Sequence, residues 1–252
     1  MSADILVSAS VVTYNDISRA AQTVNSIVTN TKKYPLKLYV IDNNSADGTA
    51  DLVEKSGQAE VIRQSKNLGF GAAHNIALTK PMGKYHFVIN PDITINSDVI
   101  SDIVDYFESN PDVVMAMPKI LNTDGTEQKL PKERPTFKRL FLGRISGKIR
   151  SEYVWAEKQI TAPCEIDFCT GCFFCIRTDV FKSMGGFDPR YFMYLEDADL
   201  SLKAKSKGKV MLLPQFCVTH AWERQSAKSL KYLFIHIVSC FKFLFKWRTK
   251  HK

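Results

Sequence analysis

The sequence predicts an α/β protein with a mainly parallel sheet flanked by helices. Two observations support this fold class. Apolar runs typical of strands alternate with segments that carry apolar residues at helical spacing. Polar residues gather where the predicted strands end, which is where parallel sheets bind their ligands. The chain has 252 residues, 45% of them hydrophobic and 24% charged, and this composition can bury a core.

The alternating elements occupy the first half of the chain. In sequence order we expect a strand at 5–13, a helix at 17–30, a strand at 36–42, a short helix at 49–57, a strand at 60–63, a helix at 71–80 and a strand at 85–89. A further helix is indicated at 97–109. Helices between successive strands are the usual connections in a parallel sheet.

Polar residues follow these segments in four places. They are Thr13, Tyr14 and Asn15; Asp42, Asn43 and Asn44; Asn67 and Gly69; and Asn90 and Asp92. Taken one at a time, helix capping and turn formation explain each group. Asp92 in particular either caps the helix at 97–109 or faces a cleft. Together, the four groups favour one shared ligand site.

Carboxylates and a histidine mark the second half of the chain. Glu196, Asp197 and Asp199 lie at the predicted start of a helix, where the positive end of the helix dipole favours negative charge. That effect alone accounts for two of the three. His220 ends the strand-like stretch 209–220, although a lone histidine is more often structural than a ligand.

The net charge of +8 is concentrated in two segments. Residues 129–150 and residues 228–252 each carry a net charge of +7, so the rest of the chain is acidic. A general nucleic-acid-binding surface is therefore not expected.

Residues 228–252 form an amphipathic pattern. On a helix, one stripe of the surface would be basic and the remainder rich in apolar side chains. The stripe contains Lys228, Lys231, Ser239, Lys242, Lys246 and Lys250, and the apolar residues outside it include Phe234, Ile237, Phe241, Leu244 and Phe245. The segment is too short and too rich in lysine to span a bilayer. It forms either a helix lying in an anionic membrane surface or a helix packed on the core or on a second subunit.

Several other classes are disfavoured. No basic and apolar leader is recognisable, so we expect a cytosolic protein whose six cysteines are reduced. Cys169, Cys172 and Cys175 have the spacing of an iron–sulfur motif, but the fourth cysteine and the proline that should follow are missing. The run GFGAAH lacks the third glycine of a dinucleotide fingerprint, and there is no Gly-Lys-Ser/Thr phosphate loop. Hydride and ATP chemistry are therefore not expected.

Taken together, the motifs resemble a known family. The chain carries VVTYN, VIDNNSADGT, NLGFGAAHN, INPD, GCFFCIRTDVFKSMGGFDPRYFMYLEDADLSLK and VTH, in that order, between residues 5 and 226. This series resembles the family 2 inverting glycosyltransferases of the GT-A fold. The NPD and GGFDPRYFMYLEDADL motifs are similar to the bacterial rhamnosyltransferase branch that builds O-antigen and other surface polysaccharides.

The resemblance implies a GT-A (Rossmann-like) fold and a role for individual residues. Asp92 and His220 would hold Mg²⁺ or Mn²⁺ on the diphosphate of a dTDP- or UDP-sugar. Asp197 would be the general base, and Glu196 and Asp199 would position it or bind acceptor hydroxyls. Asp42 would accept the N3 proton of uracil or thymine. The nucleotide-sugar pocket as a whole would contain Thr13, Tyr14, Asn15, Asp42, Asn67, Gly69 and Asn90, the last in place of the first carboxylate of the family's usual pair.

The implied reaction transfers rhamnose from dTDP-rhamnose to a lipid-linked glycan in bacterial surface polysaccharide synthesis. The alternatives are a different UDP- or dTDP-sugar donor and a non-catalytic nucleotide-sugar-binding module. Residues 1–227 would form the catalytic domain, divided into a nucleotide-binding half (1–118) and an acceptor-binding half (119–227), with 228–252 as the membrane-associating helix. We accordingly expect a cytoplasmic protein bound peripherally to the inner face of the cell membrane, with no nucleic-acid partner.

Overall fold

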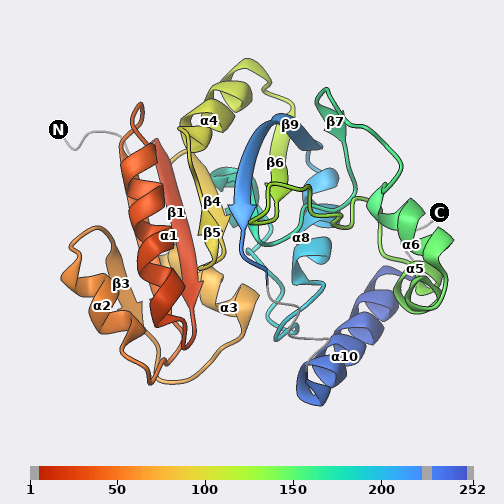
Figure 1. Ribbon diagram of the computed structural model, residues 1–252, viewed down its shortest axis with the longest axis horizontal. Helices are drawn as coiled ribbons and strands as arrows, with labels where there is room; N and C mark the ends of the chain where they lie inside the picture. The colour runs from red at the N-terminus through yellow and green to blue at the C-terminus, as the bar shows by residue number, and fades with distance from the viewer. Residues whose placement is uncertain (1–5, 223–228, 249–252) are drawn as a thin grey trace.

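The computed structural model describes residues 6–222 and 229–248, which form an α/β fold around one nine-stranded sheet (Figure 1). Across the sheet lie β3 (Glu60–Arg63), β2 (Leu36–Asp42), β1 (Val7–Thr13), β4 (Tyr85–Ile89), β8 (Phe173–Arg177), β6 (Val113–Leu121), β9 (Lys209–His220) and β5 (Ile93–Thr94), while β7 (Cys164–Glu165) pairs with β9. β5, β7 and β8 run against the other strands, so the sheet is mostly parallel, as predicted.

The helices flank this sheet. They are α1 (Ile17–Asn30), α2 (Thr49–Lys55), α3 (Phe70–His74), α4 (Val99–Ser109), α5 (Phe137–Phe141), α6 (Gly147–Val154), α7 (Thr178–Ser183), α8 (Glu196–Lys205) and α10 (Leu230–Trp247), with 3₁₀ turns η1 (Asn75–Thr79) and η2 (Leu142–Arg144). α1 shows why they pack there, because Ala20, Val24 and Ile27 recur at helical spacing and are buried in the core. The sequence therefore places one apolar face of this helix against the sheet.

The predicted elements of the first half are present with small differences. The strands at 36–42, 60–63 and 85–89 have the predicted bounds. The helix at 49–57 ends at Lys55, because Gly57 adopts a left-handed φ of 65° and its N–H donates to Glu54 O. The single helix expected at 71–80 is instead α3 followed by η1. At that junction the amide of Asn75 bonds both backbone groups of Phe187, which ties this point to a distant loop.

The C-terminal helix α10 is present, and it packs beside α5 and α6 (Figure 1). Cys240, Phe243 and Trp247 of α10 share an apolar cluster with Leu140 of α5 and Tyr153 of α6. This cluster brings the two basic segments of the sequence to one corner of the molecule. In the part of the chain that the structure describes, no helix has the length and hydropathy needed to cross a membrane.

The basic stripe predicted on this helix does not face outward as a whole. Ser239 donates to Met193 O, and Lys246 forms ion pairs with Asp188 and Asp199 at 2.7 and 2.6 Å. Lys228 and Lys250 lie outside the described residues. The acidic groups on and near α8 thus hold part of the stripe against the body, whereas Phe234, Phe241 and Phe245 are exposed.

Candidate active site

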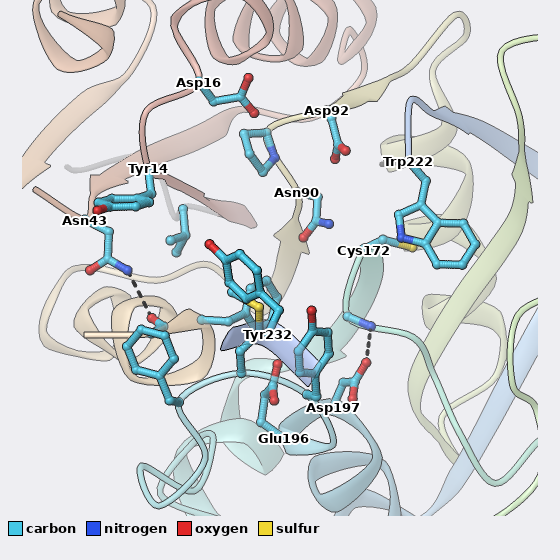
Figure 2. Close-up of a pocket in the computed structure, with 18 of the residues that line it drawn as sticks. Tyr14, Asp16, Asn43, Asn90, Asp92, Cys172, Glu196, Asp197, Trp222 and Tyr232 are labelled. Atoms are coloured by element: carbon cyan, nitrogen blue, oxygen red, sulfur yellow. Dashed lines mark hydrogen bonds between the residues drawn. The ribbon is translucent and has the colours of Figure 1, made fainter. Parts of the chain in front are cut away.

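A cavity of about 660 Å³ lies where β1, β2, β4 and β9 end and α8 begins (Figure 2). Nine of the twelve residues predicted for the site line it: Tyr14, Asn15, Asn67, Gly69, Asn90, Asp92, Glu196, Asp197 and His220. Both halves of the chain contribute. The first half supplies residues that follow β1, β3 and β4, and the second supplies Glu196 and Asp197 at the start of α8 and His220 at the end of β9. Thr13, Asp42 and Asp199 are not part of the lining.

Thr13 and Asp42 are buried at neighbouring strand ends. The two residues are paired in the register of β1 and β2. The Asp42 carboxylate accepts the Thr13 hydroxyl at 3.3 Å and the Ser45 N–H at 3.0 Å. Asp42 therefore holds the turn that presents Asn43 to the cavity. Its contact with the N3 proton of a nucleobase stays a prediction.

Asn43 also lines the cavity, in agreement with its place among the four polar groups predicted to share one ligand site, although no individual role was predicted for it. Its amide donates to Asn67 Oδ1 at 3.0 Å and to Gly69 O at 3.2 Å, and its carbonyl oxygen accepts the Leu68 N–H at 2.9 Å. Figure 2 shows Asn43 on the same side of the cavity as Tyr14. One buried asparagine thus fixes the loop that follows β3 against the end of β2.

Gly69 joins the two halves of the cavity. It has a φ of 84°, and the N–H of Phe70 next to it donates to Phe192 O at 2.9 Å. A Cβ atom on Gly69 would lie 2.1 Å from that same carbonyl oxygen. Only glycine allows the chain to approach so closely here.

We expect the substitution Gly69→Ala to destabilise the protein more than Gly57→Ala does. Both positions have a left-handed φ, which costs an L-residue about 1 kcal/mol or more, but a Cβ on Gly57 meets no atom within 4 Å. The collision with the Phe192 carbonyl adds about 1–3 kcal/mol at Gly69, so its melting temperature should fall at least about 3 °C below that of Gly57→Ala. Equal melting temperatures would refute this account of the loop contact.

Asp92 faces the cavity and does not cap the next helix. Asp98 is the cap of α4, since its carboxylate accepts the Ser101 N–H at 3.3 Å. The hydroxyl of Thr23 donates to the carbonyl oxygens of Pro91 and Ile93 on either side of Asp92, at 2.7 and 2.8 Å. These bonds fix the turn after β4. The capping alternative for Asp92 is therefore wrong.

His220 points its Nε2 atom at Asp92. The Gln128 amide N–H donates to His220 O at 2.8 Å, so the Gln128 carbonyl oxygen faces His220 Nδ1 at 3.0 Å and takes its proton. The other ring nitrogen, Nε2, lies 3.2 Å from Asp92 Oδ1. Gln128 was not singled out from the sequence, and only the fold brings it beside His220.

The two facing acceptors fit a divalent cation. Asp92 Oδ1 is buried and has no hydrogen-bond partner among the described residues, and His220 Nε2 faces it at 3.2 Å. A carboxylate oxygen and an imidazole nitrogen at this spacing suit Mn²⁺ or Mg²⁺ when substrate phosphates complete the shell. The described residues contain no cluster of three His, Cys, Asp or Glu side chains able to hold a metal by themselves. The residues present thus fit a cation that is shared with a ligand.

Asp197 and Glu196 form a carboxylate pair at the start of α8. Asp197 accepts the N–H groups of Gly171 and Ala198 at 2.8 and 2.9 Å, and Figure 2 shows it in the cavity wall. Burial raises the pKa of Asp197 to about 6, because the surrounding protein disfavours the charged form. Burial and the neighbouring Asp197 charge raise the pKa of Glu196 well above its usual range. The pair therefore retains a proton at a pH where single carboxyls are ionised.

Asp199 lies outside the cavity lining, and of its two implied roles, positioning the base or binding acceptor hydroxyls, only the first is compatible with its contacts. It is fully buried, and it forms ion pairs with Lys246 and Lys203 and accepts the Trp247 Nε1–H at 2.8 Å. These partners occupy the carboxylate on the side of α10. A direct contact of Asp199 with acceptor hydroxyls does not fit this geometry. We propose that it positions α8 instead.

The cavity also contains residues that the sequence analysis did not single out as ligands. They include Asp16, Arg19, Leu130, Tyr194, Trp222, Lys231 and Tyr232. Trp222 stacks on His220 with ring centroids 6.4 Å apart. Because it lies only two residues after His220 in the sequence, its presence in the cavity could have been predicted. Lys231 and Tyr232 belong to α10, and no local pattern shows that this helix returns to the cavity.

The cysteine motif is structural. Cys169, Cys172 and Cys175 are buried free thiols, and burial raises the pKa of each well above the usual range for a thiol. The described residues contain no group of three His, Cys, Asp or Glu side chains placed to hold a metal ion, and all three cysteines belong to the main apolar cluster. They pack there as small apolar side chains.

Comparison with known proteins identifies related sequences. A family model described as Glycosyl transferase family 2 matches residues 8–185. N-acetylglucosaminyl-diphospho-decaprenol L-rhamnosyltransferase of Mycobacterium tuberculosis is 26% identical in an alignment 192 positions long that covers 69% of this chain and 62% of that protein. Rhamnosyltransferase WbbL of Escherichia coli is 28% identical in an alignment 195 positions long that covers 71% of each chain. This chain thus spans less than two thirds of the mycobacterial relative.

A solved structure shows the same fold. The structure of GalNAc-T7 with UDP, GalNAc and Mn²⁺ superposes with a TM-score of 0.70 at 17% identity and covers 98% of this chain and 49% of that one. The GT-A architecture expected from the sequence is confirmed by this likeness, which at such identity speaks for the fold alone.

Proposed function

The chain belongs to glycosyl transferase family 2, and from this membership we propose that it transfers rhamnose from dTDP-rhamnose to a lipid-linked saccharide, with inversion at the anomeric carbon. The observation that carries the proposal is the meeting of Asp92, His220 and Asp197 in one cavity. A module that only binds a nucleotide sugar has no need of a carboxylate with a raised pKa opposite the phosphate site.

The choice of sugar and acceptor rests on the relatives. Both curated relatives described above are named as rhamnosyltransferases, and one is named for an N-acetylglucosaminyl-diphospho-lipid. We extend these names to this chain as a proposal: the donor is dTDP-rhamnose, the acceptor is a saccharide on a lipid diphosphate, and the product enters bacterial surface polysaccharide.

The donor would lie across the strand ends. Tyr14, Asn15, Asn67 and Gly69 would surround the nucleotide, and Asn90 would contact the diphosphate or the sugar. Asp92 and His220 would hold Mg²⁺ or Mn²⁺, which when bound supplies positive charge that stabilises the departing diphosphate.

Asp197 would act as the general base. Its carboxylate takes the proton of the acceptor hydroxyl, the hydroxyl oxygen bonds to the anomeric carbon, and the bond from that carbon to the diphosphate breaks with its electron pair leaving on the nucleotide. The N–H groups of Gly171 and Ala198 orient the carboxylate for this task. Glu196 would stay protonated beside it, since two adjacent carboxylates resist a second charge.

The division of the chain follows from the same assignment. We propose 1–118 as the nucleotide-binding half and 119–227 as the acceptor-binding half of a catalytic domain, with 228–252 as a membrane-associating segment. An acceptor on a lipid diphosphate stays at the bilayer, so the protein would work at the cytoplasmic face of the cell membrane as a peripheral protein.

A panel of nucleotide sugars tests the donor. In the presence of Mn²⁺, dTDP-rhamnose should raise the melting temperature and be hydrolysed faster than UDP-glucose, UDP-N-acetylglucosamine or GDP-mannose, because a ligand that binds only the native state stabilises it by mass action. Preference for another UDP- or dTDP-sugar would change the assigned donor but would leave the assignment as a glycosyltransferase intact. Stabilisation without hydrolysis or transfer would favour a nucleotide-sugar-binding module.

A further inference from the structure

Exposed apolar side chains gather on two adjacent parts of the molecule, the α5–η2 segment and α10. Among the described residues they are Phe137, Leu142 and Ile145 on the first, and Leu230, Phe234, Phe241 and Phe245 on the second. Ile145 and Phe234 expose 84% and 68% of their surface. A monomeric protein seldom exposes so many large apolar groups together, and such patches mark interaction sites.

The two parts form one continuous surface. The Phe137 ring lies 4.9 Å from the Phe141 ring, which lies 5.6 Å from the Phe241 ring of α10. Arg144 of η2 also contacts His236 of α10 through its guanidinium. The helical turn places Phe245 on the same face as Phe241, one turn further along. We call this set Phe137, Ile145, Phe234, Phe241 and Phe245 the aromatic face.

Both segments that carry the aromatic face are basic. Neither 137–150 nor 229–252 contains Asp or Glu. Lys138, Arg144 and Lys148 are exposed on the first segment, and Arg248 lies over the Phe245 ring at 4.0 Å. Apolar side chains on basic segments match the two layers of an anionic bilayer, its acyl chains and its phosphate headgroups.

The geometry points to an anionic phospholipid surface as the partner of the aromatic face. We propose that the aromatic face inserts into the outer part of one leaflet while Lys138, Arg144, Lys148 and Arg248 contact lipid phosphates. The opposite face of α10 remains on the body through Lys246 and Trp247. Because Lys231 and Tyr232 of the same helix line the cavity, docking would bring the cavity next to the bilayer. The benefit of this docking for catalysis rests on the proposed function, in which the acceptor is lipid-linked. Binding to the bilayer does not depend on that function.

Point substitutions test this better than deletion of α10. Removing the helix would expose the apolar cluster that contains Leu140 and Tyr153, and it would leave Asp188 and Asp199 without Lys246 as a partner. Loss of function in such a deletion would therefore not show that membrane binding was lost. We therefore use Phe241→Ser/Phe245→Ser for the aromatic face and Lys138→Gln/Lys148→Gln for the charge. Leu52→Ser on α2 and Lys55→Gln/Lys182→Gln are matched controls, since these side chains are exposed on other helices.

The measurement is co-sedimentation of the full chain, without nucleotide sugar, with vesicles of phosphatidylglycerol and phosphatidylethanolamine and with vesicles of phosphatidylcholine. The wild type and the controls should bind the anionic vesicles, and the aromatic double variant should bind at least about 30-fold more weakly, since it loses two apolar anchors. The lysine variant should bind anionic vesicles about tenfold more weakly and should bind phosphatidylcholine vesicles like the wild type. Binding of the wild type to anionic vesicles should weaken as the salt concentration rises.

Three results would overturn the inference. These are a wild type that stays in solution with anionic vesicles, an aromatic double variant that binds like the wild type, and a wild-type dimer that this variant converts to a monomer without any vesicle binding. The last would assign the aromatic face to a second copy of the chain. Vesicle binding that persists when no donor supports sugar transfer would instead overturn only the proposed function.

Discussion

Asp197→Asn should lower turnover by about 10²-fold or more while donor affinity barely changes. General-base catalysis is typically worth about 10²–10⁴ in rate, and an amide cannot accept the acceptor proton. The variant should remain folded, because it removes a buried charge whose ionisation the surrounding protein disfavours. Steady-state turnover with saturating acceptor, and calorimetric titration of the donor, measure the two quantities.

The same residue should set the acid limb of the pH profile. The base must be deprotonated to act, and burial raises the pKa of Asp197 to about 6. Activity should therefore rise with pH through about 6, and kcat/KM should show this limb in the wild type but not in Asp197→Asn. Asp112→Asn, an exposed aspartate paired with Lys209, should keep the wild-type rate and profile. A near-normal rate in Asp197→Asn would move the role of base to Glu196.

Asp92→Asn should abolish metal-dependent donor binding. Calorimetric titration of dTDP-rhamnose with and without Mn²⁺ should show that Mn²⁺ strengthens binding to the wild type and no longer does so in the variant. Loss of a residue that only supports a metal ligand already costs about 10–100-fold, so loss of the ligand itself should cost at least that much.

The same substitution should make the ligand-free protein more stable. Asp92 Oδ1 is buried without a hydrogen-bond partner, 3.2 Å from His220 Nε2. A buried carboxylate oxygen that accepts no hydrogen bond costs free energy that a neutral amide does not. Stability gained with function lost is typical of active-site residues. Metal-dependent donor affinity that is unchanged in the variant would contradict the role of Asp92.

There is a physical reason why the sequence is sufficient to predict the strands and the residues at their ends. Each strand from β1 to β4 has a local apolar pattern, and the parallel arrangement then places Asn15, Asn67 and Asp92 at one edge. No distant contact is needed to anticipate this. The same holds for Glu196 and Asp197, whose helix start is visible in the local sequence.

Distant contacts explain what the sequence could not predict. Gln128 is 92 positions from His220 and bonds both its ring and its carbonyl, which no local pattern shows. In the sequence, Asp199 is one of three acidic residues at a helix start, and nothing nearby shows that Lys246 and Trp247 of α10 are its partners. The sequence left the packing of α10 open for the same reason, because the acidic partners of Lys246 lie far away in the chain.

The most direct test of the account is transfer from dTDP-rhamnose to an N-acetylglucosaminyl-diphospho-lipid in the presence of Mn²⁺, with the anomeric configuration of the product determined by NMR. The wild type should form a rhamnosyl product whose anomeric configuration is opposite to that of the donor, and Asp197→Asn should form it about 10²-fold or more slowly. A product that retains the configuration of the donor, or equal rates in the two proteins, would contradict a single displacement assisted by Asp197.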